Sequence, residues 1–178
     1  MQVEINPSEY TVLIVDDTIA NVLLLKVLIG NQKYRIVTAG NGMEALQAVE
    51  KESPDLILLD IMMPDLDGYE VIKHLKADPA TQDIPVIFLT ALHNPEDIVK
   101  GFKTGASDYI SKPFNKEELL IRVTHQISLI AAKRVIASQM EELQSTIRGR
   151  DRLYSVIAHD LRSLMGSLKM IFNLLMAQ

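Results

Sequence analysis

The sequence predicts an α/β fold, a doubly wound (βα)5 parallel sheet that is followed by one long C-terminal helix or coiled coil. Short apolar runs alternate with stretches of helical periodicity over residues 1–130. The apolar runs are almost continuously hydrophobic, which is typical of parallel strands covered on both faces. From about Leu129 the pattern changes to a sustained heptad, and no proline occurs after Pro113.

Five strands and five helices are expected in alternating order. The strands are predicted at 11–15 (TVLIV), 34–38 (YRIVT), 55–60 (DLILLD), 84–90 (IPVIFLT) and 107–111 (SDYIS). The helices are predicted at 18–29, 42–51, 67–77, 95–103 and from 115 onward. Glycines and prolines that interrupt regular structure mark the joins, namely Gly30, Gly40, Pro54, Pro79, Gly105 and Pro113.

The composition indicates a folded, aliphatic-rich protein. The 178 residues are 48% hydrophobic and 23% charged, which suits one ordinary domain with an appendage. The absence of cysteine excludes disulfides and thiolate metal sites. The first eight residues lack the basic region of a signal peptide, and the apolar run at 22–30 is short and interrupted by Lys26. We therefore expect a cytoplasmic protein without a membrane segment.

The charge is distributed unevenly along the chain. Residues 1–131 hold 11 Lys and Arg against 19 Asp and Glu, whereas residues 132–178 hold 7 against 4. This division predicts two units with different roles. The acidic balance of the larger unit argues against nucleic acid as its partner.

Polar residues gather where the predicted strands end. Asp16 and Asp17 follow the first strand, Asp60 ends the third, Thr90 ends the fourth, and Lys112 follows the fifth. In an open parallel sheet, ligands bind at the carboxyl ends of the strands. Three adjacent carboxylates repel one another, and a hard cation such as Mg²⁺ relieves that repulsion.

These residue types are suited to phosphoryl chemistry. A carboxylate such as Asp60 can attack phosphorus to form an aspartyl phosphate, while Mg²⁺, Lys112 and Thr90 neutralise the phosphoryl oxygens. Each residue taken alone has a plainer interpretation, since an Asp pair after a strand can cap a helix and Lys-Pro can form a turn. Their joint position at one edge favours the functional interpretation.

The motifs VLIVDDTIAN, PDLILLDIMMPDLDGYEV, PVIFLTA and GASDYISKPF, with their spacing, resemble the receiver domain of two-component response regulators. The resemblance covers about residues 10–130 and sets the expected domain at 9–128. It implies the flavodoxin-like strand order 2-1-3-4-5. It also implies that Asp60 is the phosphoacceptor and that Asp16, Asp17, Asp60 and the backbone carbonyl of Met62 bind Mg²⁺.

The same resemblance assigns further roles. Thr90 and Tyr109 correspond to the switch pair, and Lys112 to the lysine that contacts the phosphoryl group. A cis peptide is expected before Pro113, and the small Ala91 leaves room for the phosphoryl group. The implied partners are a histidine kinase catalytic domain or a phosphotransfer protein.

The tail carries an apolar stripe at heptad spacing. Twelve of the fourteen stripe positions hold Leu, Ile, Met or Tyr, and only Lys133 and Arg150 interrupt it; the positions are 129, 133, 136, 140, 143, 147, 150, 154, 157, 161, 164, 168, 171 and 175. A homodimer or helical bundle is expected, with 129–150 as a coiled-coil signalling helix. Two alternatives remain: the helix folds back on the domain, or it breaks at Gly149.

IAHDLRSLMGSL resembles the phosphoacceptor helix, or H-box, of sensor histidine kinases. His159 would be the phosphoacceptor and Asp160 would orient its imidazole, which places part of a kinase dimerisation helix at 151–178. Leu164 stands where that family usually has proline, so a straighter helix is expected. By heptad position alone, His159 is an ordinary outward-facing residue.

Three functions follow from these patterns. The first is a signalling module, a fragment of a receiver-first hybrid histidine kinase, in which the ATP-binding motifs lie outside this sequence. The second is a stand-alone response regulator whose coiled-coil tail is its protein-interaction output. The third is a relay that passes phosphate between His159 and Asp60.

Overall fold

The computed structural model describes residues 5–91 and 95–176 and consists of two units, Met1–Ala132 and Lys133–Gln178. The first unit holds a parallel sheet with the strand order β2-β1-β3-β4-β5, which confirms the flavodoxin-like prediction. Its strands are β1 (Thr11–Val15), β2 (Arg35–Ala39), β3 (Leu56–Asp60), β4 (Val86–Thr90) and β5 (Asp108–Ser111). Its helices are a 3-10 turn η1 (Pro7–Glu9), α1 (Ile19–Gly30), α2 (Gly42–Glu52), α3 (Gly68–Ala77), α4 (Pro95–Lys103) and the start of α5 (Lys116–Met176).

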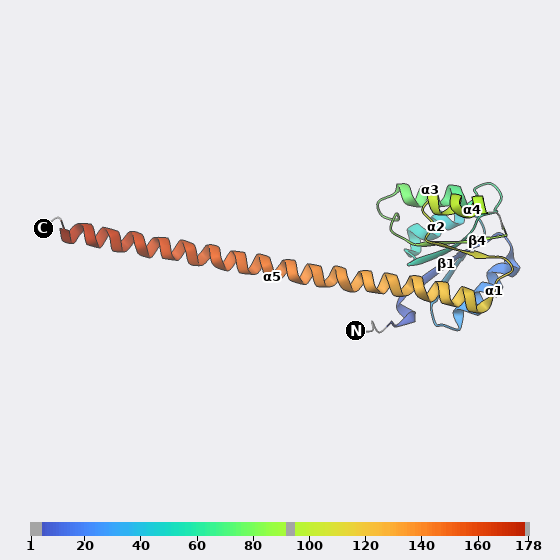
Figure 1. Ribbon diagram of the computed structural model, residues 1–178, viewed down its shortest axis with the longest axis horizontal. Helices are drawn as coiled ribbons and strands as arrows, with labels where there is room; N and C mark the ends of the chain where they lie inside the picture. Colours follow the sequence, from blue (N-terminus) through green and yellow to red (C-terminus); the bar gives the residue numbers. More distant parts are fainter. Residues whose placement is uncertain (1–4, 92–94, 177–178) are drawn as a thin grey trace. The chain divides into compact units, whose positions relative to one another are not determined.

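Helices cover both faces of the sheet. Figure 1 shows α1 and the first turns of α5 on one face, and α2, α3 and α4 on the other. The first face is packed with buried side chains such as Leu25 of α1 and Val123 of α5. The second face packs Val49 of α2 and Ile72 of α3 against Phe88 of β4. Strands β1, β3 and β4 are buried along their whole length, as their continuous hydrophobicity predicts.

The predicted elements lie within two residues of the observed ones. The fourth strand begins at Val86 instead of residue 84, because Pro85 has no N–H and contributes only its carbonyl, to Ile57 N. The fifth helix begins after Asn115, whose side chain caps it by accepting from Glu118 N at 3.0 Å.

The second unit consists of α5 from Lys133 onward. Its stripe residues from Ile136 to Leu164 are exposed, so the single chain leaves the apolar face uncovered. The side chains of residues 168, 171 and 175 lie outside the described residues. The helix break considered at Gly149 is wrong, because α5 passes through this residue without interruption. A single glycine costs a helix only about 1 kcal/mol, and its neighbours are good helix formers.

Among the described residues, no helix combines the length and the apolar character that crossing a bilayer requires.

Candidate functional site

Three carboxylates meet at the carboxyl edge of the sheet. Asp60 is the last residue of β3, and Asp16 directly follows β1. Each of these and Asp17 offers a carboxylate oxygen, and the three oxygens lie within 4.8 Å of one another. Asp16 and Asp60 are buried, with 1% and 3% of their surface exposed, whereas Asp17 is exposed. The convergence expected from the strand ends is therefore present.

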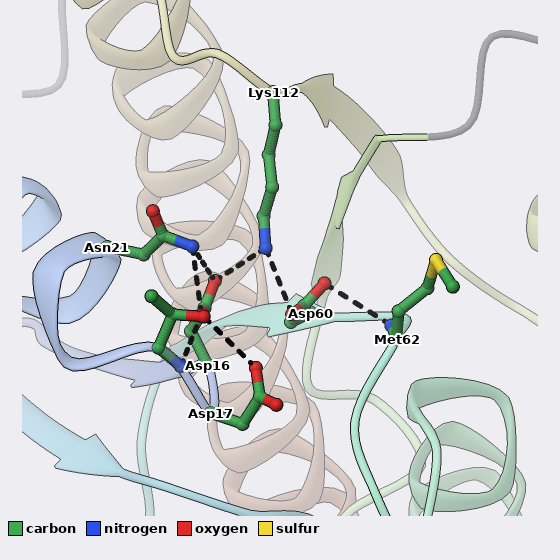
Figure 2. Close-up of polar contacts among 7 residues, drawn as sticks. Asp16, Asp17, Asn21, Asp60, Met62 and Lys112 are labelled. Atoms are coloured by element: carbon green, nitrogen blue, oxygen red, sulfur yellow. Dashed lines mark hydrogen bonds and ion pairs between the residues drawn. The ribbon is translucent and has the colours of Figure 1, made fainter.

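Lys112 joins two of these carboxylates. Its Nζ lies 2.7 Å from Asp16 Oδ2 and 2.9 Å from Asp60 Oδ2 (Figure 2). The lysine follows β5, and its backbone N–H donates to the Thr90 carbonyl at 2.7 Å. The peptide between Lys112 and Pro113 is cis, as expected. One ammonium group therefore sits between two buried anions that would otherwise repel each other.

The electrostatics of the pair follow from this burial. Burial raises the pKa of the Asp60 carboxyl above its usual range, and the charge of Asp16 adds to that effect, while Lys112 and the Met62 N–H oppose it. Burial lowers the pKa of Lys112, but its hydrogen bonds to both carboxylates and their charges outweigh burial, so its pKa is raised. Lys112 is therefore an ammonium ion at neutral pH.

Asp16 is held by two further donors that the sequence analysis did not assign. Its Oδ1 accepts from Thr18 N at 2.9 Å. The side-chain amide of Asn21 lies 3.0 Å from Oδ1 and 3.1 Å from Oδ2 of the same carboxylate, as Figure 2 shows. Asn21 belongs to the VLIVDDTIAN motif and stands on the first turn of α1, so its position near Asp16 was available as a signal.

The loop after Asp60 lies tightly against the strand. Met62 N donates to Asp60 Oδ1 at 3.3 Å, and Met62 is 61% exposed beside the site. Gly68 N donates to the Ile61 carbonyl at 2.9 Å, where α3 begins. Asp67 caps that helix in a reciprocal capping box with Glu70. These contacts fix the path of the chain that follows the Asp60 carboxylate.

The two residues of the expected switch pair differ in their surroundings. Thr90 is buried at the end of β4, whereas Tyr109 on β5 is partly exposed. The Tyr109 ring packs edge-on against Phe102 of α4, with centroids 6.0 Å apart. The Arg122 guanidinium of α5 lies 5.4 Å from the Tyr109 ring centroid and pairs with Asp108 at 2.7 Å. Tyr109 is thus in contact with both α4 and α5.

His159 lies in the second unit. Its side chain is 82% exposed, and Nδ1 is 3.4 Å from Oδ1 of Asp160 on the same helix. The stripe residues Ile157 and Leu161 on either side of it are exposed as well, so the outward heptad position of His159 stays a prediction.

The chemistry of the donor set suits Mg²⁺. Carboxylate oxygens are the hard ligands that this ion takes, and two of them are already shielded from water and fixed by hydrogen bonds. The exposed Asp17 leaves the cluster accessible from solvent. The residues present therefore fit a hydrated divalent cation held by Asp16, Asp17 and Asp60.

Comparisons with known proteins agree with this geometry. The family model described as "Response regulator receiver domain" matches residues 12–124. The chain is 39% identical over 161 residues to a Vibrio cholerae protein named "Probable cyclic di-GMP phosphodiesterase", with 88% of the chain and 36% of that protein covered. It is 44% identical over 112 residues to the response regulator PleD of Caulobacter vibrioides, which covers 63% of the chain and 25% of PleD. The chain thus spans about a third or less of these relatives.

A solved structure shows the same fold. The signal receiver domain of a signal transduction histidine kinase from Syntrophus aciditrophicus is 36% identical and superposes with a TM-score of 0.63, covering 67% of this chain and 90% of that one. Three findings agree: the sheet order, the acidic edge with its lysine, and the family match over most of the first unit. The chain belongs to the response regulator receiver domain family and carries the receiver domain of a two-component response regulator.

Proposed function

We propose that the chain accepts a phosphoryl group on Asp60 in the presence of Mg²⁺. The observation that carries the proposal is the buried Asp60 carboxylate, which lies 2.9 Å from the Lys112 ammonium and close to the carboxylates of Asp16 and Asp17. A carboxylate in this setting is a fixed nucleophile with cationic charge beside it. Asp16, Asp17, Asp60 and the Met62 carbonyl would hold the metal, which when bound supplies positive charge to the phosphoryl oxygens.

The transfer conserves electrons and atoms. An oxygen of Asp60 forms a bond to phosphorus, while the bond from phosphorus to the donor breaks and the donor atom keeps the electron pair. The donor is a phosphohistidine or an acyl phosphate, so no oxidant or reductant takes part. The Lys112 ammonium then pairs with a phosphoryl oxygen instead of the free carboxylate, and the Thr90 hydroxyl donates a hydrogen bond to another phosphoryl oxygen. Tyr109 then follows Thr90 inward, as the resemblance to the receiver family implies.

Phosphate mapping tests this proposal. The chain is incubated with ³²P-labelled acetyl phosphate and Mg²⁺, and the labelled residue is identified by mass spectrometry after borohydride trapping. Wild type is expected to carry base-labile label on Asp60, and D60N is expected to carry none. D65N is a matched control, because Asp65 lies on the same loop outside the carboxylate cluster. Label in D60N at the wild-type level would contradict the proposal.

We also propose that the tail forms a parallel coiled-coil homodimer. Its stripe residues are exposed in the single chain; Leu143, for example, is 61% exposed. Exposed apolar side chains at heptad spacing are buried when two such helices pair. The likeness to the Vibrio cholerae phosphodiesterase covers 88% of the chain, more than the unit Met1–Ala132, so it continues into this helix. This favours a response-regulator connector that links the receiver to an output.

Sedimentation equilibrium tests the dimer. Wild type is expected to sediment as a dimer at micromolar concentration. L143D is expected to sediment as a monomer, because it places two carboxylates in the apolar seam. S145D makes the same charge change two residues away on the outward face and is expected to leave the dimer intact. A monomeric wild type would refute the dimer.

A hybrid histidine kinase is the second candidate, and the exposed His159 beside Asp160 is the observation that favours it. In that case His159 is a second phosphoacceptor, which receives phosphate from a kinase catalytic domain or exchanges it with Asp60. The same labelling experiment distinguishes it. Acid-labile, base-stable label that disappears in H159Q would support phosphohistidine. Label confined to Asp60 would contradict exchange of phosphate between the two residues.

A further inference from the structure

We infer that Asn21 is a positioning residue for the metal site, acting through Asp16. This inference rests on the proposed Mg²⁺-dependent function and assigns a role to a residue outside the carboxylate cluster. The amide nitrogen of Asn21 lies 3.0 Å and 3.1 Å from the two oxygens of Asp16, so it restrains the rotation of that carboxylate. Thr18 N and Lys112 Nζ contact one oxygen each, at 2.9 Å and 2.7 Å.

The local structure supports a specific role for this side chain. Asn21 stands in the first turn of α1, inside the helix, where asparagine is less favourable than alanine. Its side chain does not cap the helix, because it is directed to Asp16 on the preceding loop. The side chain is thus unfavourable for its helix and donates its hydrogen bonds to a buried carboxylate, which points to a role in that contact.

The neutrality of the amide matters for the electrostatics. Asp16 is buried and already faces one full positive charge from Lys112. A second cationic donor at position 21 would cancel the charge that attracts a metal ion. An apolar residue would leave the carboxylate free to turn away from the cluster. The amide fixes the orientation of Asp16 while its negative charge stays available to a cation, as outer-shell hydrogen bonds do at metal sites.

The expected effect is on metal affinity. Outer-shell substitutions typically weaken metal binding by about 10- to 100-fold. We expect the Mg²⁺ dissociation constant of N21L to rise about tenfold, and that of N21K to rise at least as much.

Isothermal titration calorimetry with MgCl₂ measures the affinity, and thermal unfolding in EDTA reports whether each variant folds. N31L is the matched control, since Asn31 follows the last turn of α1 and the chemical change is identical. N21A, with a good helix former, replaces N21L if the latter does not fold. Equal Mg²⁺ affinity in wild type and the position-21 variants would overturn the inference. Absence of Mg²⁺ binding in wild type itself would instead overturn the proposed function.

Discussion

Replacement of Gly68 by alanine is expected to destabilise the first unit strongly. Gly68 is the first residue of α3 and packs directly on the backbone of the strand end that carries Asp60. A Cβ at this position would overlap the carbonyl oxygen of Asp60 and would lie 2.8 Å from Ile61 Cα. Both neighbours are backbone atoms, so the conflict cannot be relieved by rotating a side chain.

The magnitude follows from two costs. Overpacking against rigid neighbours costs about 1–3 kcal/mol. Moving α3 away also weakens the 2.9 Å hydrogen bond from Gly68 N to the Ile61 carbonyl, which adds about 1 kcal/mol. We therefore expect G68A to lower the free energy of unfolding by about 3 kcal/mol. Phosphorylation is expected to slow as well, because the displaced backbone belongs to Asp60 itself.

Urea unfolding followed by circular dichroism measures the change. G30A is the matched control, because Gly30 ends α1 with only Ile36 Cδ1 near its added Cβ, at 3.8 Å. That variant is expected to be unchanged or more stable by about 0.5–1 kcal/mol, since alanine favours the helix. A loss below about 1 kcal/mol in G68A, together with unchanged phosphorylation, would refute the steric reasoning.

Three further substitutions test other contacts. K112M leaves two buried carboxylates without their ion-pair partner, so the melting temperature in EDTA is expected to fall. Mg²⁺ is expected to raise the melting temperature of K112M by more than that of wild type. Equal Mg²⁺ responses would contradict this. A double-mutant cycle of R122L and D108N in urea unfolding is expected to give a coupling energy of about 0.5–1 kcal/mol, because both side chains are partly exposed. A coupling energy of zero would refute the pairing. K76M removes a donor to two loop carbonyls at 2.6 Å and 2.9 Å, and it is expected to lower the free energy of unfolding by about 1.5–3 kcal/mol. K73M, on the exposed face of the same helix, is the control and is expected to leave the stability unchanged.

Periodicity and strand ends were sufficient to predict the sheet and its acidic edge. The fully buried strands read as continuous apolar runs, and the parallel arrangement then brings Asp16, Asp60 and Lys112 to one edge. The VLIVDDTIAN motif places Asn21 near Asp16 along the chain, but the hydrogen bonds between their side chains depend on how α1 packs, which the sequence alone does not give. The pairing of Arg122 with Asp108 depends in the same way on the rotation of α5.

The helix break at Gly149, which the sequence left open as an alternative, is absent for a different reason. Local propensity is a weak signal, and the long run of helix-forming residues on both sides outweighs one unfavourable residue. In the proposed homodimer a second chain covers the apolar stripe of the tail, and a single sequence indicates such a contact only through its periodicity.

The Lys112 bridge has a consequence for how the protein behaves in a cell. Since an ammonium group of the chain already balances two of the carboxylates, the folded state does not depend on a dissolved cation to bring these acids together. Under the proposed Mg²⁺ dependence, scarcity of magnesium would then leave the receiver folded but unable to accept phosphate, instead of unfolded and open to proteolysis. Signalling could resume as soon as the ion returned, without the delay of new synthesis.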